Sequence, residues 1–174
     1  QGWLAGKEDS LDCIIRAMDN FTSLNVNIDV NVTIQHYNAD HLDKIVGWVM
    51  KCWPNVHHFV FNNLDPTSDR VAENKDTVPK LFEMELALMR ALQMLEASGR
   101  SYRVERVPLC YMVEYAHAST ETRKIVKEEE RVVHFLDERG TIRQTSWEHG
   151  KSAVCKICTL NPICAGLFEM DKHY

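Results

Sequence analysis

Hydrophobic and polar residues alternate strictly along residues 26–35. The hydrophobic positions are Val26, Ile28, Val30, Val32 and Ile34, and the polar positions between and after them are Asn27, Asp29, Asn31, Thr33 and Gln35. Because successive side chains of a strand point to opposite faces of its sheet, the pattern predicts a strand with one polar face. Two further strands are predicted over residues 56–62 and 102–107.

Hydrophobic residues at helical spacing predict three helices, one before each of these strands. The first begins at Ser10, the second opens at Asn38 or Asp40 and ends before Pro54, and the third runs from a cap at Thr77 to Ala97. Their apolar stripes are, in order, Leu11, Ile14, Ile15, Met18 and Phe21; Leu42, Ile45, Val46, Val49 and Trp53; and Leu81, Met84, Leu88, Leu92 and Leu95.

Strands separated by helices of this length pair in parallel through right-handed crossovers. Residues 1–109 are therefore predicted to form an α/β unit with three parallel strands, part of either a barrel or an open sheet. The interior of a closed eight-strand barrel is filled by Val, Ile and Leu, whereas the polar row of the first strand would line a wet cavity. A solvated face of an edge strand is the alternative.

In both architectures a ligand site lies at the C-terminal ends of the strands. The polar side chains expected to line it are Asn31, Thr33, Gln35, Asn62 and Asn63. A turn at Asn62-Asn63 is the alternative to a ligand contact there.

Residues 110–174 are expected to form a second, smaller unit. A short charged helix is predicted from residue 120 to 129, followed by a β-hairpin that turns at Arg139-Gly140. A hairpin there folds the chain back, so that Cys110 can approach the cysteines after residue 154. This unit has too little core to stand alone, and a bound metal would staple it.

The cysteines near the C-terminus have metal-ligand spacing. Cys155 and Cys158 are separated by two residues and Cys164 follows after five, and thiolates two residues apart can bind one metal centre. Gly166 lets the backbone pass close to an inorganic core. Cys110 is the expected fourth ligand. Thiols without metal are the alternative reading of the same pattern.

Composition and charge exclude other classes of function. The chain has 174 residues, a net charge of −5 and six cysteines, and the acidic balance argues against binding nucleic acid. No apolar run approaches the roughly 20 residues of a membrane span, and no signal-peptide pattern is present. Six cysteines without secretory features favour metal or redox chemistry in the cytoplasm. The chain starts without an initiator Met and is expected to be a piece of something longer.

Three segments, in this order, carry a resemblance to a known family. Gly6–Asp12 is similar to the family's loop before a mid-barrel helix, and Val30–Ile34 with Asn38 is similar to its strand that bears one Asn and precedes another. Cys155–Cys164 and the preceding hairpin are similar to the auxiliary-cluster segment of the SPASM and twitch subclasses. The chain thus resembles, over nearly its whole length, the C-terminal half of a radical S-adenosylmethionine (SAM) enzyme.

The resemblance implies half of a TIM-like barrel, an auxiliary 4Fe-4S cluster on Cys110, Cys155, Cys158 and Cys164, and S-adenosylmethionine as the cofactor of the whole protein. The family's C-x3-C-x2-C loop is absent, since only Cys13 and Cys52 precede Cys110. Phe168 stands where the SPASM pattern has a further cysteine. One auxiliary site is therefore expected, and the chain alone is expected to be inactive.

Two functions remain open from the sequence. One is a radical SAM enzyme that modifies a small molecule or a peptide; the alternative is a non-catalytic, zinc-stapled binding module, because four thiolates also suit tetrahedral zinc. An open sheet edge is a template for another chain, so a homo-oligomer is expected. The competing expectation is that the hairpin unit covers the open face.

Overall fold

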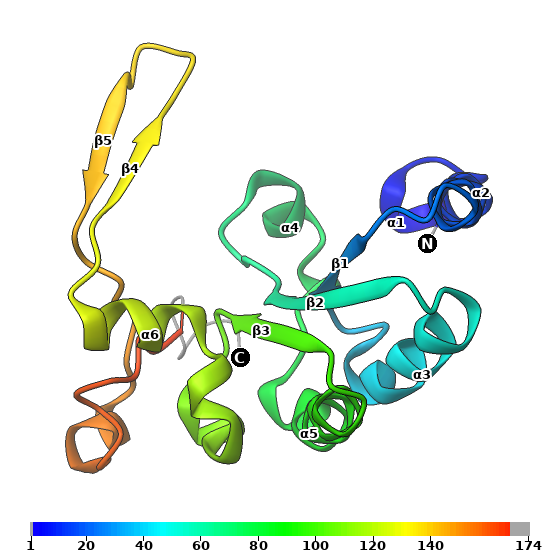
Figure 1. Cartoon of the computed structure of the whole chain (residues 1–174). Helices are drawn as coiled ribbons and strands as arrows, with labels where there is room; N and C mark the ends of the chain where they lie inside the picture. The colour runs from blue at the N-terminus through cyan, green and yellow to red at the C-terminus, as the bar shows by residue number, and fades with distance from the viewer. Residues whose placement is uncertain (1, 168–174) are drawn as a thin grey trace.

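The computed structural model describes residues 2–167, and Figure 1 shows three helix–strand units followed by a smaller C-terminal part. The predicted alternation of helices and strands is confirmed. The elements of the first part are α1 (Gly2–Ala5), α2 (Ser10–Ser23), β1 (Ile28–Ile34), α3 (Leu42–Cys52), β2 (Val56–Asn63), α4 (Asp69–Glu73), α5 (Leu81–Ala97) and β3 (Ser101–Glu105).

The main sheet has three parallel strands in the order β1-β2-β3, as predicted. Its register places Val32 beside Phe61 and Phe61 beside Val104, so residues of one face follow each other across the strands. Within the described residues β1 and β3 are the two edges. The sheet is thus an α/β arrangement with three parallel strands, and its place in a barrel remains a prediction.

The hydrophobic core lies between one face of this sheet and helices α3 and α5 (Figure 1). Ile34, Phe59 and Phe61 from the sheet have no exposed surface, and burial of each such side chain contributes about 1.5–3 kcal/mol. The predicted stripe of α5 is confirmed, because all of its members are buried: Leu81, Met84, Leu88, Leu92 and Leu95.

Helix α2 differs from the prediction in what its apolar stripe contacts. Ile15 and Met18 pack against the core, whereas Leu11, Ile14 and Phe21 are 43%, 46% and 48% exposed. The helix lies beyond the open edge of β1 (Figure 1), where the described residues provide no further strand to cover this face. The helix is therefore present, but its stripe is only partly buried.

The predicted N-cap of α5 is wrong by three residues. The Thr77 hydroxyl donates to the carbonyl of Asn74 inside a 3-10 turn, and the residue that precedes the helix is Lys80. The backbone N–H of Lys80 donates to the Glu83 carboxylate at 3.1 Å, which is half of a capping box. Pro79 fits this end, because the residue before a proline is disfavoured in the helical conformation, and Val78 is indeed extended.

The C-terminal part contains α6 (Thr120–Lys127), whose first turn is capped by the Ser119 hydroxyl, and a two-stranded antiparallel hairpin of β4 (Arg131–His134) and β5 (Thr141–Gln144). The hairpin was predicted and is confirmed. It projects away from the rest of the chain (Figure 1). It does not cover the main sheet.

The C-terminal part is anchored in the same core as the sheet. Leu109, Met112 and Leu167 are at most 1% exposed and belong to the core cluster that contains Phe59. Described residues of the predicted second unit, 110–174, therefore pack in the same core as the predicted first unit, 1–109. Phe168, on which the expectation of a single auxiliary site depends, lies outside the described residues. No helix between residues 2 and 167 is long and apolar enough to cross a membrane.

Candidate metal centre and strand-end site

Three successive turns present the C-terminal cysteines on one side of the chain. A 3-10 turn, Ala153–Ile157, carries Cys155, and the N–H of Cys158 donates to the Cys155 carbonyl at 3.2 Å. A later turn is closed by the N–H of Cys164, which donates to the Leu160 carbonyl at 2.9 Å. Short turns of this kind keep cysteines close in space when they are close in sequence.

Cys110 arrives from the other direction, in the 3-10 turn Leu109–Tyr111 that follows β3. It lines the same cavity, of about 30 Å³, as Cys155, Cys158 and Cys164. The other lining residues are Pro108, Lys151, Leu160, Asn161 and Gly166. The structure therefore brings together the four cysteines that the sequence singled out, from two segments more than forty residues apart.

The four sulfurs do not yet form a single-ion site. Among the residues that the structure describes, no group of three or more His, Cys, Asp or Glu side chains is arranged to hold a metal ion. A tetrahedral zinc ion has Zn–S bonds of about 2.3 Å. Binding one ion would therefore require the sulfurs to draw closer together.

The electrostatics of the cavity favour the neutral thiol at Cys110. Partial burial raises the pKa of Cys110, and the neighbouring thiols of Cys164, Cys158 and Cys155 raise it further. A like charge nearby disfavours ionisation in the same way as desolvation does. Metal binding at Cys110 would therefore release a proton.

The residues on either side of Gly166 are hydrogen-bonded to the backbone of residues 149 and 150. The N–H of His149 donates to the Ala165 carbonyl at 2.6 Å, and the N–H of Leu167 donates to the Gly150 carbonyl at 2.8 Å. Gly166 itself has a φ of +81° and donates its N–H to the Sγ of Cys164 at 3.4 Å. Backbone N–H donors of this kind orient a thiolate and stabilise its negative charge.

The other two cysteines lie outside this cavity, and all six are free of disulfide bonds. The Cys13 sulfur lies 3.6 Å from Lys7 Nζ and 3.4 Å from Arg16 Nη2 on α2. Cys52 is exposed at the end of α3.

The face of the sheet opposite the helices is polar, as the alternation in β1 predicts. Neighbouring register positions give three rows across the strands on this face. The rows are Asp29, His58 and Ser101; Asn31, Val60 and Arg103; and Thr33, Asn62 and Glu105. Asp29, Asn31 and Thr33 are exposed, so the polar row of β1 meets solvent in this structure.

The end of β1 is organised by side-chain hydrogen bonds. The amide of Asn38 donates to the Thr33 carbonyl at 2.9 Å, and its oxygen accepts from the Gln35 N–H at 2.9 Å. The side-chain oxygen of Gln35 in turn accepts from the Tyr37 N–H at 3.0 Å. Asn38 and Gln35 therefore shape the turn after the strand, while Thr33 and Asn31 present their side chains on its polar face.

The two asparagines at the end of β2 point to opposite faces. Asn62 lies on the polar face, where its oxygen accepts from Arg106 Nη1 at 2.9 Å. Asn63 has no exposed surface and donates to the Arg106 carbonyl at 3.2 Å. Asn63 thus supports the backbone bend at Arg106, whose φ is +60°, and does not lie beside Asn62 at the mouth of the sheet.

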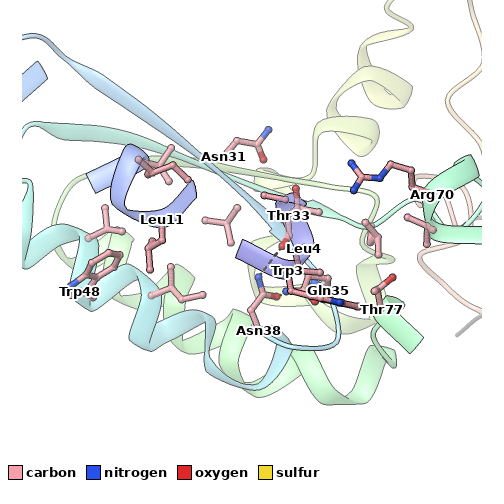
Figure 2. A pocket seen from close by; sticks show the side chains of 18 of the residues that line it. Trp3, Leu4, Leu11, Asn31, Thr33, Gln35, Asn38, Trp48, Arg70 and Thr77 are labelled. Carbon is pink, nitrogen blue, oxygen red and sulfur yellow. Dashed lines mark hydrogen bonds between the residues drawn. The ribbon is translucent and has the colours of Figure 1, made fainter. Parts of the chain in front are cut away.

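A larger cavity, of about 770 Å³, lies along the open edge of β1 between α1, α2, α3 and α4 (Figure 2). Three of the predicted ligand-site residues line it, namely Asn31, Thr33 and Gln35. Trp48 from α3 and Leu11 from α2 form part of its apolar wall, and Arg70 lies at one end. Its size is within the range of small-molecule sites, and polar groups gather on one side of it.

Sequence reasoning missed Arg106, Glu121 and Lys151. The Glu121 carboxylate accepts from the Arg106 N–H at 3.2 Å, and burial raises the pKa of this carboxyl. Nothing in the local sequence marks these positions, because their neighbours come from other segments of the chain.

No family model, curated protein or solved structure matches the chain.

Proposed function

We propose that this chain is the C-terminal part of a radical SAM enzyme and that its cysteine segment holds an auxiliary 4Fe-4S cluster. The observation that carries the proposal is the shared cavity of Cys110, Cys155, Cys158 and Cys164. Only thiols among its lining residues are strong metal ligands, and such donors select iron–sulfur clusters, zinc or copper(I). The order of the sequence segments described above supports the family.

The remaining residues of the cavity suit a cluster. Pro108 and Leu160 contribute apolar surface to the lining, and the Gly166 N–H is aimed at the Cys164 sulfur. Hydrogen bonds to sulfur and solvent exclusion both tune the potential of such a group. When bound, the cluster supplies one-electron transfer. The protein holds the ligands and controls their surroundings.

The whole enzyme would bind S-adenosylmethionine and modify a small-molecule or peptide substrate by radical chemistry. The polar groups Asn31, Thr33 and Gln35 beside the larger cavity, and Asn62 on the same face of the sheet, support a polar ligand at the strand ends. Reductive cleavage of S-adenosylmethionine needs an iron with a free coordination site, which four cysteine ligands do not leave. This chain alone should therefore produce no 5′-deoxyadenosine.

The cytoplasm is the compartment that we propose for this protein. The six cysteines are all free, and such thiols persist where glutathione keeps proteins reduced. An oxygen-sensitive iron–sulfur cluster also requires a reducing compartment.

A zinc-stapled binding module is the second candidate, and the all-thiol donor set of the cysteine cavity is the observation that favours it. In that case the metal has a purely structural role and the polar face of the sheet binds a partner or ligand without chemistry. The donor set alone suits both metals.

Anaerobic purification separates the two functions. The chain is reconstituted with iron and sulfide, and iron, sulfide, zinc and visible absorption are measured; C52S is the matched control, since Cys52 lies outside the cavity. We expect a brown protein with about four iron and four sulfide ions per chain. One colourless zinc ion per chain, bound in preference to iron, would instead establish the zinc module. Detection of 5′-deoxyadenosine by mass spectrometry after strong reduction would contradict the auxiliary role.

A further inference from the structure

We propose that Lys151 sets the reduction potential of the metal centre, an inference that rests on the iron–sulfur function proposed above. Lys151 is the one charged residue among the described residues that line the cysteine cavity. The cysteine spacing does not point to it, because it lies four residues before Cys155, outside the ligand pattern.

Lys151 is held in place on two sides. Its Nζ donates to the Asn161 carbonyl at 3.0 Å and to the Glu148 carboxylate at 3.2 Å. Its side chain is 21% exposed, whereas that of Glu148 is 58% exposed. The Cγ of Lys151 also packs over Gly166, 2.9 Å from the position that a Cβ atom would occupy there. Lys151 therefore lines the cavity with its ammonium bound to the loop between Cys158 and Cys164, and the Glu148 carboxylate that balances its charge is the more solvated partner.

A fixed cation at this place has a defined effect on a thiolate-bound cluster. Four thiolates give the centre a net negative charge, and reduction adds one more. A positive charge nearby stabilises the reduced form more than the oxidised form, so it raises the reduction potential. Because the side chain is mostly buried, solvent screens this interaction less than it screens a surface charge.

The lysine also tethers the loop between Cys158 and Cys164 through the Asn161 carbonyl. A purely structural tether and an electrostatic role make different predictions. Loss of a tether lowers the amount of cluster that the protein holds, whereas loss of the charge shifts the potential of the cluster that remains. An arginine at this position keeps the charge but changes the hydrogen-bond geometry.

The test is a redox titration of the reconstituted chain in four variants. We expect Lys151→Met to lower the ratio of reduced to oxidised cluster at the wild-type midpoint by at least about threefold, which is roughly 30 mV for a one-electron couple. Lys151→Arg should stay close to wild type. Lys156→Met is the matched control, because Lys156 lies between Cys155 and Cys158 in sequence but is exposed and does not line the cavity.

Glu148→Gln tests the same idea in the opposite direction and in a side chain that is largely exposed. Removal of this carboxylate leaves the Lys151 charge uncompensated, so the potential should become more positive. The proposal is overturned if Lys151→Met leaves the midpoint unchanged, if Lys151→Arg shifts it as far as Lys151→Met, or if Glu148→Gln has no effect.

A failure of the iron–sulfur function is recognised separately, because the wild-type chain would then take up no cluster. The lysine is in that case tested by titration with Co²⁺, whose absorption reports thiolate coordination. A cation beside four thiolates should strengthen binding, so Lys151→Met should weaken Co²⁺ affinity about threefold or more. Equal affinities of the variant and the wild type overturn the proposal.

Discussion

The carbonyl oxygen of Gly150 would clash with a Cβ atom placed on Gly166. Gly166 also has a φ of +81°, a conformation that costs other residues roughly 1–2 kcal/mol. Gly166→Ala should therefore destabilise the chain by more than about 2 kcal/mol, because neither the backbone carbonyl nor the dihedral angle can adjust cheaply. Urea unfolding of the two proteins measures this difference, and metal content should fall with it.

Gly140→Ala is the control for this change. Gly140 has a φ of +59° in the hairpin turn, but no atom lies within 4 Å of its added Cβ. It should cost only about 1 kcal/mol, the conformational part of the effect. Equal losses in the two variants would mean that the contact with Gly150 contributes nothing.

Cys110 is the proposed ligand whose removal discriminates most clearly, because it comes from the other segment of the cavity. Cys110→Ser should lower bound iron by more than about half and should loosen residues 110–167, since the metal links the two segments. Iron analysis together with hydrogen exchange of the C-terminal part measures both effects.

Cys13→Ser and Cys52→Ser provide the matched controls, as neither side chain lines the cavity. Both should retain the iron content of the wild type. Unchanged metal in Cys110→Ser would show that the fourth ligand is another group.

Glu121 makes stability depend on pH. Burial raises the pKa of this carboxyl, so the folded chain binds its proton more tightly than the unfolded chain does. The stabilisation from this group is fully present below the unfolded pKa and is lost as pH rises through the folded pKa. Glu121→Gln keeps an oxygen for the Arg106 N–H, so it should be more stable than the wild type at pH 7 and less pH-dependent.

Urea midpoints between pH 4 and 7 check this prediction, with Glu138→Gln on the exposed hairpin as the control. The control should follow the wild-type curve. A Glu121→Gln curve parallel to the wild type would mean that Glu121 ionises equally in the folded and unfolded chains.

The open edge of β1 predicts self-association. The Ile34 carbonyl faces β2 and accepts from the Leu64 N–H. The preceding carbonyl, that of Thr33, faces the other way and accepts from the Asn38 side-chain amide. The C-terminal end of the outer edge of β1 is therefore already hydrogen-bonded. Further back, reversing the charge at Asp29 should disrupt pairing with another chain. We expect an assembly larger than 20.1 kDa that Asp29→Lys dissociates without unfolding, measured by light scattering after size exclusion.

His57→Lys is the control, because His57 is exposed on the central strand, away from either edge. It should leave the assembly intact. A monomer of the wild-type chain at high concentration would contradict the prediction.

The parallel sheet and its polar face could be predicted from sequence because their signals are local. Strict alternation from Ile28 to Ile34 defines a strand with two unlike faces, and the stripe of α5 defines a buried helix face. The grouping of Cys110 with Cys155 also followed, since thiols at ligand spacing need a partner and few others were present. These features depend on residue type and spacing alone.

Other features depend on contacts that no local pattern encodes. Arg106 adopts a positive φ because Asn62, Asn63 and Glu121 hold its side chain and backbone, and a non-glycine residue gives no warning of this. Lys151 looks like an ordinary surface lysine until Asn161 is placed beside it. Three of the five stripe residues on α2 stay exposed because burial depends on what lies opposite the helix.

The burial of Leu167 has a consequence for how the protein is made. This side chain belongs to the same core as Ile34 and Phe59, which enter the chain far earlier. During synthesis the sheet and its helices can pair as they emerge, yet the core stays incompletely filled until residue 167 has left the ribosome. Contacts of such long sequence separation form late and slow the final step of folding. The cysteine cavity therefore closes last, and the proposed metal centre could assemble only at that stage.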